Sequence, residues 1–245
     1  MDISRQTYYK YRNKEDKDYE EYILIKKAFE EGQELYGYRR LKKLIFEKYK
    51  IKINHKKILR LMKKYGLKVK YERIYKKNST KQRQEKIESG NLLNRKFIAE
   101  KENEKWCTDI TYLIYKNKKA YLSSILDLKN RKIIAYKIGR KNDNKLVIET
   151  LKEAIRKNKD VQGTILHSDH GFQYTSIEYR AICQSKGIII SMSRKGTPID
   201  NSPIESFHAN LKRETLYSNN ITSIEKYIEL VDNWIKFYNS DRIRL

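Results

Sequence analysis

Three carboxylic acids in three short motifs are the residues of this chain whose types and spacing best suit catalysis. Asp109 lies in the motif WCTDITY, Asp169 lies in HSDHGFQY, and Glu205 lies in DNSPIESF. There are 35 residues between Asp169 and Glu205. Two Asp and one Glu in this pattern suit a site that holds divalent metal against a nucleic-acid phosphodiester. The motifs therefore predict chemistry that cuts and joins DNA.

Magnesium is the metal that this set of ligands indicates. Mg²⁺ gives up water reluctantly and usually takes only one or two protein carboxylates. Two ions about 3.5–4 Å apart can activate an attacking oxygen and stabilise a leaving one. Three carboxylates suffice if Asp109 bridges both ions. Most of the 31 Asp and Glu residues should be ordinary surface charges. Asp127, on the second predicted strand, should cap the adjacent turn instead.

The elements that position these carboxylates are predicted from a change of pattern near residue 105. Strands with short connections, followed by helices that alternate with short buried strands, match the order of a ribonuclease-H-like α/β fold. Asp109 then falls midway along the first strand, Asp169 at the end of the fourth, and Glu205 early in a helix. The predicted strands are 106–115, 120–127, 132–138, 164–168 and 188–192, and the predicted helices are 145–158, 176–186, 203–216 and 223–239.

The helix after Glu205 carries one further candidate. Lys212 follows Glu205 by seven residues, which places it on the same helix face about 10.5 Å along the axis, and His208 lies close to that face. A lysine there could hold a DNA phosphate beside the metals. The alternative is a lysine that simply faces solvent.

The amino-terminal third predicts a basic helical module. Helices are expected over 19–31, from the YGYRR motif to about Tyr49, and over 54–65. Gly66 should end the third helix in a left-handed conformation. Helix, turn and basic helix together suggest a helix-turn-helix whose second helix enters the major groove. A small solvated helical bundle is the alternative. The candidate DNA contacts are Arg39, Arg40, Lys56, Lys57 and Arg60.

Charge and composition favour a polyanionic partner. The formal net charge is +24, and residues 42–83 hold 17 Lys or Arg against only two Glu. A Lys-rich chain from an AT-rich genome would share part of this signal. Cys107 and Cys183 are too few for a disulfide framework or a zinc site, and Cys183 should lie in the core. No apolar run is long enough to span a membrane and no signal peptide is visible, so we expect a cytoplasmic protein.

These motifs resemble those of bacterial insertion-sequence transposases, which share the integrase catalytic core with retroviral integrases. The likeness rests on WCTDITY, HSDHGFQY, SMSRKG and DNSPIESFHANLKRE, and on the amino-terminal motifs YGYRR, ILRLM and GL. It runs from about Ser4 to Arg242 and matches the second-frame product of such elements. It implies a helical, helix-turn-helix-like DNA-binding domain over 1–67, a basic linker over 68–100, and a ribonuclease-H-like integrase catalytic core over 101–245.

The resemblance also implies an activity. Asp109, Asp169 and Glu205 would form the acidic triad with Mg²⁺, or Mn²⁺ in its place. The substrates would be the terminal inverted repeats of the element and a target DNA. Cleavage at the ends and strand transfer by a 3′-hydroxyl would proceed without a covalent protein–DNA intermediate. Lys212 matches a basic position that contacts DNA, and the protein would act as a homo-oligomer on DNA in the bacterial nucleoid.

Three positions depart from the family pattern. Residue 170 is His where Arg is commoner, which would alter a DNA contact. The chain stops at Leu245, where the family usually continues for about thirty residues. Met1 falls where the family pattern normally continues from an upstream frame that carries another helix-turn-helix and a coiled coil. We therefore expect this product to work as a fusion or with that upstream product, or to be a decayed copy.

Other functions are weighed on the same residues. A retroviral-type integrase is excluded because its zinc-binding domain needs two His and two Cys, whereas residues 1–100 contain only His55 and no Cys. A structure-selective nuclease would need a fourth carboxylate. A catalytically inactive, truncated DNA-end-binding regulator of transposition stays open as the alternative to an active transposase.

Overall fold

The computed structural model describes residues 5–6, 16–71, 90–194 and 197–244. It divides into two compact units, one formed by residues 1–72 with 242–245, the other by residues 73–241. Part of the predicted linker, residues 72–89, lies outside the described residues. Within the described part of the chain, no helix is long and apolar enough to cross a membrane.

Over residues 16–71, the first unit is a three-helix module. Its helices are α2 (Tyr19–Glu31), α3 (Tyr38–Tyr49) and α4 (His55–Lys64), close to the predicted ranges. Apolar residues at helical spacing face one another and are fully buried, including Ile25, Leu41 and Ile58. Gly66 follows α4 with φ +71°, which confirms the predicted left-handed cap.

The second unit is built on a five-stranded mixed sheet. The strand order is β3-β2-β1-β4-β5, with β1 antiparallel to β2, β2 antiparallel to β3, and β4 parallel to both β1 and β5. This order follows from the sequence, because short turns join the first three strands while helical crossovers lead to the last two. The strands are β1 (Lys105–Tyr115), β2 (Lys118–Asp127), β3 (Ile133–Gly139), β4 (Ile165–Ser168) and β5 (Ile189–Met192).

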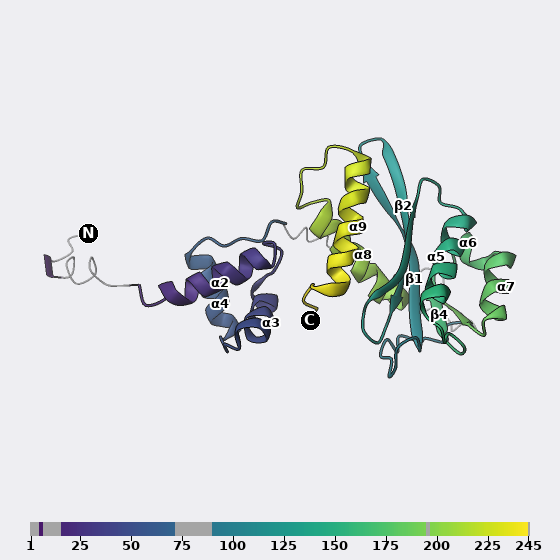
Figure 1. The fold of residues 1–245 in the computed structure, drawn as a ribbon, viewed down its shortest axis with the longest axis horizontal. Helices are drawn as coiled ribbons and strands as arrows, with labels where there is room; N and C mark the ends of the chain where they lie inside the picture. Colours follow the sequence, from purple (N-terminus) through teal and green to yellow (C-terminus); the bar gives the residue numbers. More distant parts are fainter. Residues whose placement is uncertain (1–4, 7–15, 72–89, 195–196, 245) are drawn as a thin grey trace. The chain divides into compact units, whose positions relative to one another are not determined.

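Helices cover both faces of this sheet (Figure 1). One face carries α5 (Asn144–Lys157), α6 (Phe172–Thr175) and α7 (Ile177–Ser185). The other carries α8 (Ser202–Thr215), preceded by the 3₁₀ turn η1 (Pro198–Asn201), and α9 (Ile224–Ser240). The fold is therefore the predicted ribonuclease-H-like α/β core. The four-residue helix α6 was not predicted, because it is too short to show a helical period.

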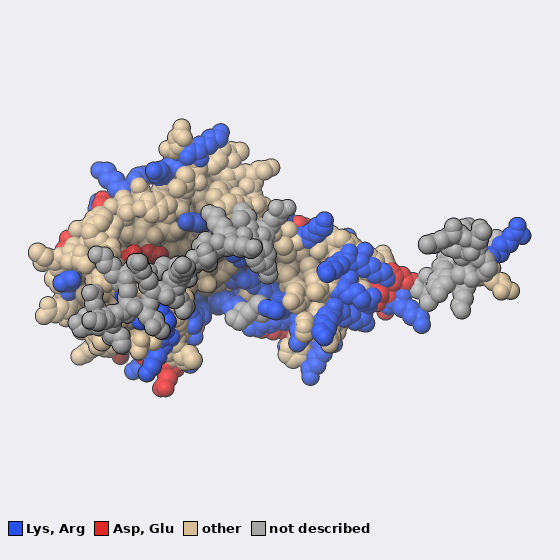
Figure 2. Space-filling view, turned by 180° about the vertical axis from the view of Figure 1, so that it is seen from behind, with Lys and Arg blue, Asp and Glu red and all other residues tan. Residues whose placement is uncertain are grey.

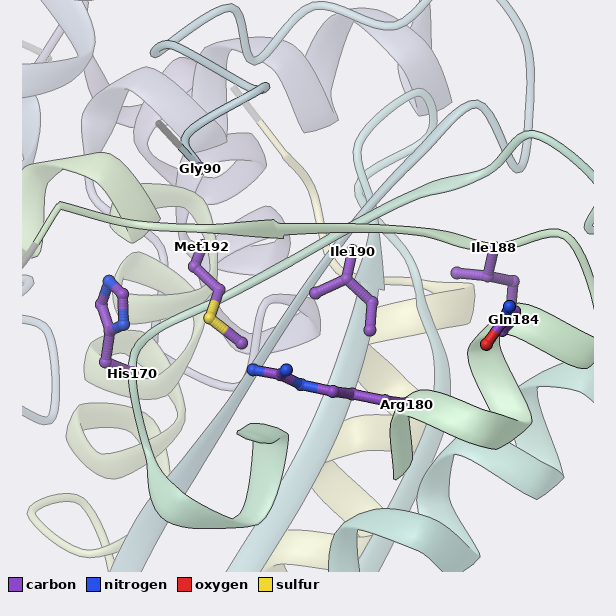
Figure 3. A pocket seen from close by; sticks show the side chains of 7 residues that line it. All are labelled: Gly90, His170, Arg180, Gln184, Ile188, Ile190 and Met192. Carbon is purple, nitrogen blue, oxygen red and sulfur yellow. The ribbon is translucent and has the colours of Figure 1, made fainter. Parts of the chain in front are cut away.

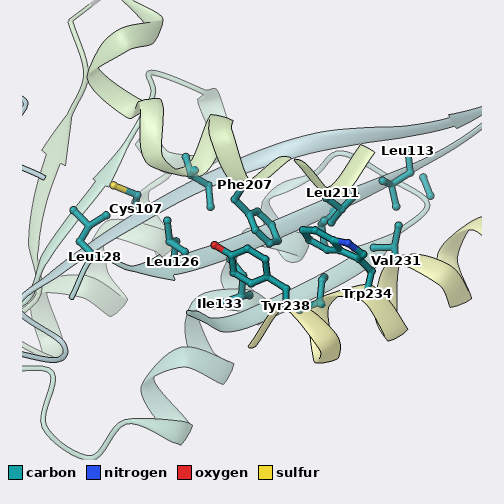
Figure 4. Close-up of a cluster of buried hydrophobic side chains, with 14 of the residues drawn as sticks. Cys107, Leu113, Leu126, Leu128, Ile133, Phe207, Leu211, Val231, Trp234 and Tyr238 are labelled. Atoms are coloured by element: carbon teal, nitrogen blue, oxygen red, sulfur yellow. The ribbon is translucent and has the colours of Figure 1, made fainter. Parts of the chain in front are cut away.

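Each face has its own hydrophobic core. Under α8 and α9, Phe207 and Leu211 pack with Trp234 and Tyr238 against the strands (Figure 4). On the opposite face, Trp106 packs with residues of α5 and α7, and Cys183 is buried there as predicted. Burying one large apolar side chain contributes about 1.5–3 kcal/mol, so the first of these layers fixes α8 against the sheet.

Asp127 confirms its predicted structural role. Its Oδ1 accepts hydrogen bonds from the backbone N–H groups of Lys129 (2.8 Å) and Asn130 (3.2 Å), and its Oδ2 accepts one from that of Asn103 (2.7 Å). The side chain is buried and fully engaged in the turn. It is therefore a capping residue.

Candidate active site

Asp109 lies in the middle of the central strand β1, as predicted. It stands directly opposite Ser124 of β2 in the antiparallel register. Its side chain is 23% exposed, and its Oδ1 accepts a hydrogen bond from the backbone N–H of Ile110 (2.8 Å). The strand thus presents a partly exposed carboxylate directly after the buried residues Trp106, Cys107 and Thr108.

Asp169 comes immediately after β4, at its carboxyl end. Cys107 of β1 pairs with His167 of β4 in the parallel register, so continuing that register by two residues brings Asp169 level with Asp109. Its Oδ1 accepts a hydrogen bond from the backbone N–H of Gly171 (2.9 Å). A Cβ on Gly171 would lie 3.0 Å from the same oxygen, so this tight turn favours glycine.

The pKa of Asp169 is raised, first because neighbouring groups desolvate the carboxyl and then because Asp109 is negatively charged. Glu205, in the first turn of α8, shows the same effect. Its pKa is raised by desolvation and then by the charges of Asp109 and Asp169. The three predicted carboxylates therefore lie within one another's electrostatic field. Among the described residues, however, no group of three His, Cys, Asp or Glu side chains is close enough to share one ion.

The site fits a hard divalent cation in its chemistry. All three donors are carboxylate oxygens, the ligands that Mg²⁺ and Mn²⁺ prefer. The negative charges also oppose one another, and a bound cation would relieve that repulsion. The carboxylates would have to draw together for all three to reach one ion.

Lys212 lies on the same helix as Glu205 and is half-buried. Burial lowers the pKa of its ammonium group, while the charge of Asp109 opposes that shift. Lys212 forms no ion pair or side-chain hydrogen bond with a described residue. A cation that is partly desolvated beside carboxylates is poised to bind an anion.

His208 is a member of the site that spacing alone did not assign. It is buried on α8. Its Nδ1 lies 3.5 Å from Asp109 Oδ2, and its Nε2 lies 2.8 Å from Ser124 Oγ. The only sequence signal was its position three residues after Glu205, near the face of Lys212.

Asp200 forms a second acidic centre just before α8. It is completely buried, and its two oxygens accept side-chain hydrogen bonds from Arg194 (both 2.8 Å), Arg95 (2.8 Å) and Asn91 (2.8 Å). The hydrogen bonds from Arg194 hold the pKa of this carboxyl well below its usual range. Asp200 ties the segment ahead of β1 to the loop that leads into α8, and so it fixes the start of the helix that carries Glu205.

Comparison with known proteins identifies the family. Models of the integrase core domain match residues 99–198 and 186–243, and a model of an HTH-like domain matches residues 15–75. The chain is 35% identical over 251 residues to the putative transposase InsK for insertion sequence element IS150 of Escherichia coli (strain K12). That alignment covers 100% of this chain and 86% of the relative. The chain belongs to the insertion-sequence transposase family.

Other proteins agree with this assignment. An uncharacterized transposase-like protein of Haemophilus influenzae is 40% identical over 198 residues, which cover 79% of this chain and 88% of that protein. Among solved structures, a chain of the simian T-cell lymphotropic virus intasome, in complex with PP2A regulatory subunit B56 gamma, resembles this transposase-family chain with a TM-score of 0.51. Their identity is 18%, over 83% of this chain and 66% of that one, so this likeness shows the fold alone.

A pocket of about 440 Å³ in the transposase core is lined by His170, the residue that follows Asp169 (Figure 3). His170 and Arg180 supply its polar wall, while Ile188, Ile190 and Met192 supply apolar surface. The side chain of Arg180 extends across the pocket toward Met192 (Figure 3). Arg180 has no ion pair with a described residue. This wall could accept a phosphate of DNA that passes the site.

Two of the predicted DNA contacts in the helical unit are occupied within the unit. The guanidinium of Arg60 donates two hydrogen bonds to Asp18 (2.8 and 2.7 Å), and Lys57 donates one to Glu21 (2.7 Å). These pairs connect α4 to the start of α2. A DNA phosphate would compete with carboxylates for both cations.

Two of the other predicted contacts are more available. Arg39 and Lys56 are exposed, and neither forms an ion pair with a described residue. Arg40 is half-buried with its guanidinium over the ring of Tyr36. Lys and Arg atoms cover much of the visible surface of the helical unit (Figure 2). The HTH-like unit of this transposase thus presents a strongly basic surface.

Proposed function

We propose that this protein catalyses metal-dependent cleavage at the ends of an insertion sequence and transfer of the cut strand into target DNA. The observation that carries the proposal is that the pKa values of Asp169 and Glu205 are raised, first by desolvation and then by the negative charges of the neighbouring carboxylates, Asp109 among them. Structural carboxylates are normally neutralised by partners, whereas like charges held together suit a site that receives cations.

Each residue then has a defined task. Asp109, Asp169 and Glu205 would hold two Mg²⁺ ions, for which Mn²⁺ could substitute. When bound, these cations activate the attacking oxygen and stabilise the leaving oxygen of an in-line displacement at phosphorus. Lys212 holds a phosphate of the same strand beside the carboxylates. Asp200 fixes the start of α8 and thereby the position of Glu205.

The partners follow from the two units. The helical unit binds the terminal inverted repeats, with Arg39 and Lys56 the most available of the candidate contacts and Arg40, Lys57 and Arg60 behind them. The protein acts as a homo-oligomer on DNA in the bacterial cytoplasm, because two ends must be brought together. An upstream-frame product with a helix-turn-helix and a coiled coil, or a fusion to it, supplies further DNA binding.

The test is nicking and strand transfer with Mg²⁺ on duplex DNA that carries the inverted repeat flanking this gene. Glu205→Gln should lower both reactions by about 1000-fold or more, equivalent to about 4 kcal/mol of transition-state stabilisation, while end binding persists. Glu225→Gln is the matched control, because Glu225 also lies in the first turn of a core helix but away from the carboxylates. It should retain activity.

The contrary result is equally clear. If the wild type binds the end but never cuts, even with Mn²⁺ and the upstream-frame product added, the chain is an end-binding regulator. Equal loss of activity in the Glu205 and Glu225 variants would remove Glu205 from the site.

A further inference from the structure

We infer that His208 and Ser124 are positioning residues that hold the Asp109 carboxylate for cation binding. The inference rests on the proposed function, since it concerns the same site. The three side chains form a continuous row, with Ser124 Oγ 2.8 Å from His208 Nε2 and His208 Nδ1 3.5 Å from Asp109 Oδ2. They come from three elements, β2, α8 and β1.

The fold brings these residues together through strand register. Asp109 and Ser124 are direct partners in the antiparallel pair β1–β2, so their side chains point to the same face of the sheet. That face is the one covered by α8, whose His208 lies over both. The backbone of Ser124 is itself fixed, because its carbonyl accepts a hydrogen bond from Thr108 Oγ1 (3.1 Å).

The tautomer of His208 decides which atoms of the row donate hydrogen bonds and which accept them. In the tautomer that carries its proton on Nδ1, the imidazole would turn this N–H toward Asp109 across the 3.5 Å contact, and its Nε2 would accept a hydrogen bond from the Ser124 hydroxyl. The other oxygen of Asp109 is already held by the backbone N–H of Ile110 (2.8 Å). Both carboxylate oxygens therefore have a protein neighbour, which limits rotation of the group. Partners of this kind orient metal ligands and raise their affinity.

The same three residue types form the triad of serine hydrolases, but the burial here excludes that use. A triad serine must reach its substrate. Ser124 is 0% exposed, whereas Asp109 is 23% exposed. In this protein the serine is the buried anchor, and the carboxylate is the end that faces the substrate.

His208 also links Asp109 to the helix of Glu205. Both residues lie on α8, one turn apart. Any shift of α8 that moved Glu205 would therefore move the contact on Asp109 as well. The row therefore couples the position of the Asp109 carboxylate to that of Glu205.

The experiment measures Mn²⁺ binding to the full chain by titration calorimetry with MnCl₂ alone. His208→Leu should weaken binding by about 10- to 100-fold. Ser124→Ala should weaken it by about three- to tenfold, the effect of one hydrogen bond. The double variant should lose no more than His208→Leu, because the serine acts through the histidine. His208→Gln, whose amide can bridge hydroxyl and carboxylate, should recover part of the affinity.

Ser123→Ala is the matched control. Ser123 is also buried on β2, next to Ser124, and its hydroxyl has no hydrogen-bond partner among the described residues. Its removal should change Mn²⁺ affinity by less than about twofold. Thermal unfolding of the metal-free variants separates loss of fold from loss of positioning, and His208→Gln should unfold close to the wild type.

Three results would overturn the inference. The first is an unchanged Mn²⁺ affinity in the His208 variants while the wild type binds Mn²⁺, which leaves the proposed function intact. The second is equal loss in Ser124→Ala and Ser123→Ala, which would indicate a general packing effect. The third is a wild type that binds no Mn²⁺ at all, which would defeat the proposed function and the inference together.

Discussion

Two acidic centres lie on either side of the start of α8, and their surroundings shift their pKa values in opposite directions. Asp200 is fully buried and surrounded by the guanidinium groups of Arg194 and Arg95, which lower its pKa. The pKa of Glu205 is raised instead, first by desolvation of its carboxyl and then by the negative charges of Asp109 and Asp169. The first arrangement stabilises the fold. In the second, like charges repel one another, and a bound cation would reduce that repulsion. A carboxylate's partners therefore separate structural from functional acids better than its burial does.

The largest effect should come from removing the satisfied acid. Asp200→Ala leaves two guanidinium groups without their carboxylate and should lower the free energy of unfolding by about 3 kcal/mol. Urea denaturation measures this loss. Asp160→Ala, an exposed acid with no ion pair to a described residue, should change it by less than about 0.5 kcal/mol. Equal losses would end the distinction between the two centres.

Proton competition should separate the two centres next. The pKa values of Asp169 and Glu205 are raised. Protons therefore compete with cations for these two groups at higher pH than they do for ordinary carboxylates. Mn²⁺ affinity should fall as pH is lowered, by about tenfold per pH unit for each proton displaced. Calorimetry between pH 8 and 5 tests this. A flat profile would contradict the raised pKa values of Asp169 and Glu205.

Substitution of Lys212, a cation on the same helix as Glu205, should have a smaller effect, which is on DNA affinity. Lys212→Ala should weaken binding to end DNA by severalfold and reduce the dependence of log affinity on log salt by about 1. Fluorescence anisotropy at several salt concentrations measures both. Lys226→Ala is the control, since Lys226 is exposed on α9 and paired with Glu229. A Lys212 variant with the wild-type salt slope would mean that this lysine touches no phosphate.

The smallest effect concerns stability without metal. A carboxyl whose folded pKa is raised stabilises the fold only at low pH, and that contribution is lost as pH rises through the folded pKa. Glu205→Gln should therefore raise the melting temperature of the metal-free protein at pH 7 by about 1–3 °C. Glu225→Gln, which gives up the pair with Arg140, should not raise it. A lower melting temperature for Glu205→Gln would contradict the proposed repulsion between Glu205 and the neighbouring carboxylates.

The sequence predicted much of this architecture because its signals were local. Apolar, β-branched runs separated by turn residues placed β1 to β3, and the DNSP start signal placed Glu205 in the first turn of α8. The cap formed by Asp127 followed from its place before a turn. These features depend on neighbours within a few positions, so one chain is enough to predict them.

The contacts that the sequence did not reveal are those set by register and by the loops. The row from Ser124 to Asp109 needs the pairing of β1 with β2, and a shift of one residue would move Ser123 into place instead. The carboxylate of Asp200 meets Arg95, which lies 105 positions earlier. The pairing of Arg60 with Asp18 likewise joins two helices and could not be seen in a basic helix pattern.

The two tryptophans of the chain belong to the cores on opposite faces of the sheet: Trp106 lies on β1 and packs with α5 and α7, and Trp234 lies on α9 and packs with α8. Each is therefore a natural fluorophore for one layer. Single Trp→Phe variants would let emission follow the two layers separately during unfolding or DNA binding. Trp234 also donates a hydrogen bond from its indole nitrogen to Glu214 on α8 (3.1 Å). Its emission wavelength would report directly on whether the helix that carries Glu205 stays docked.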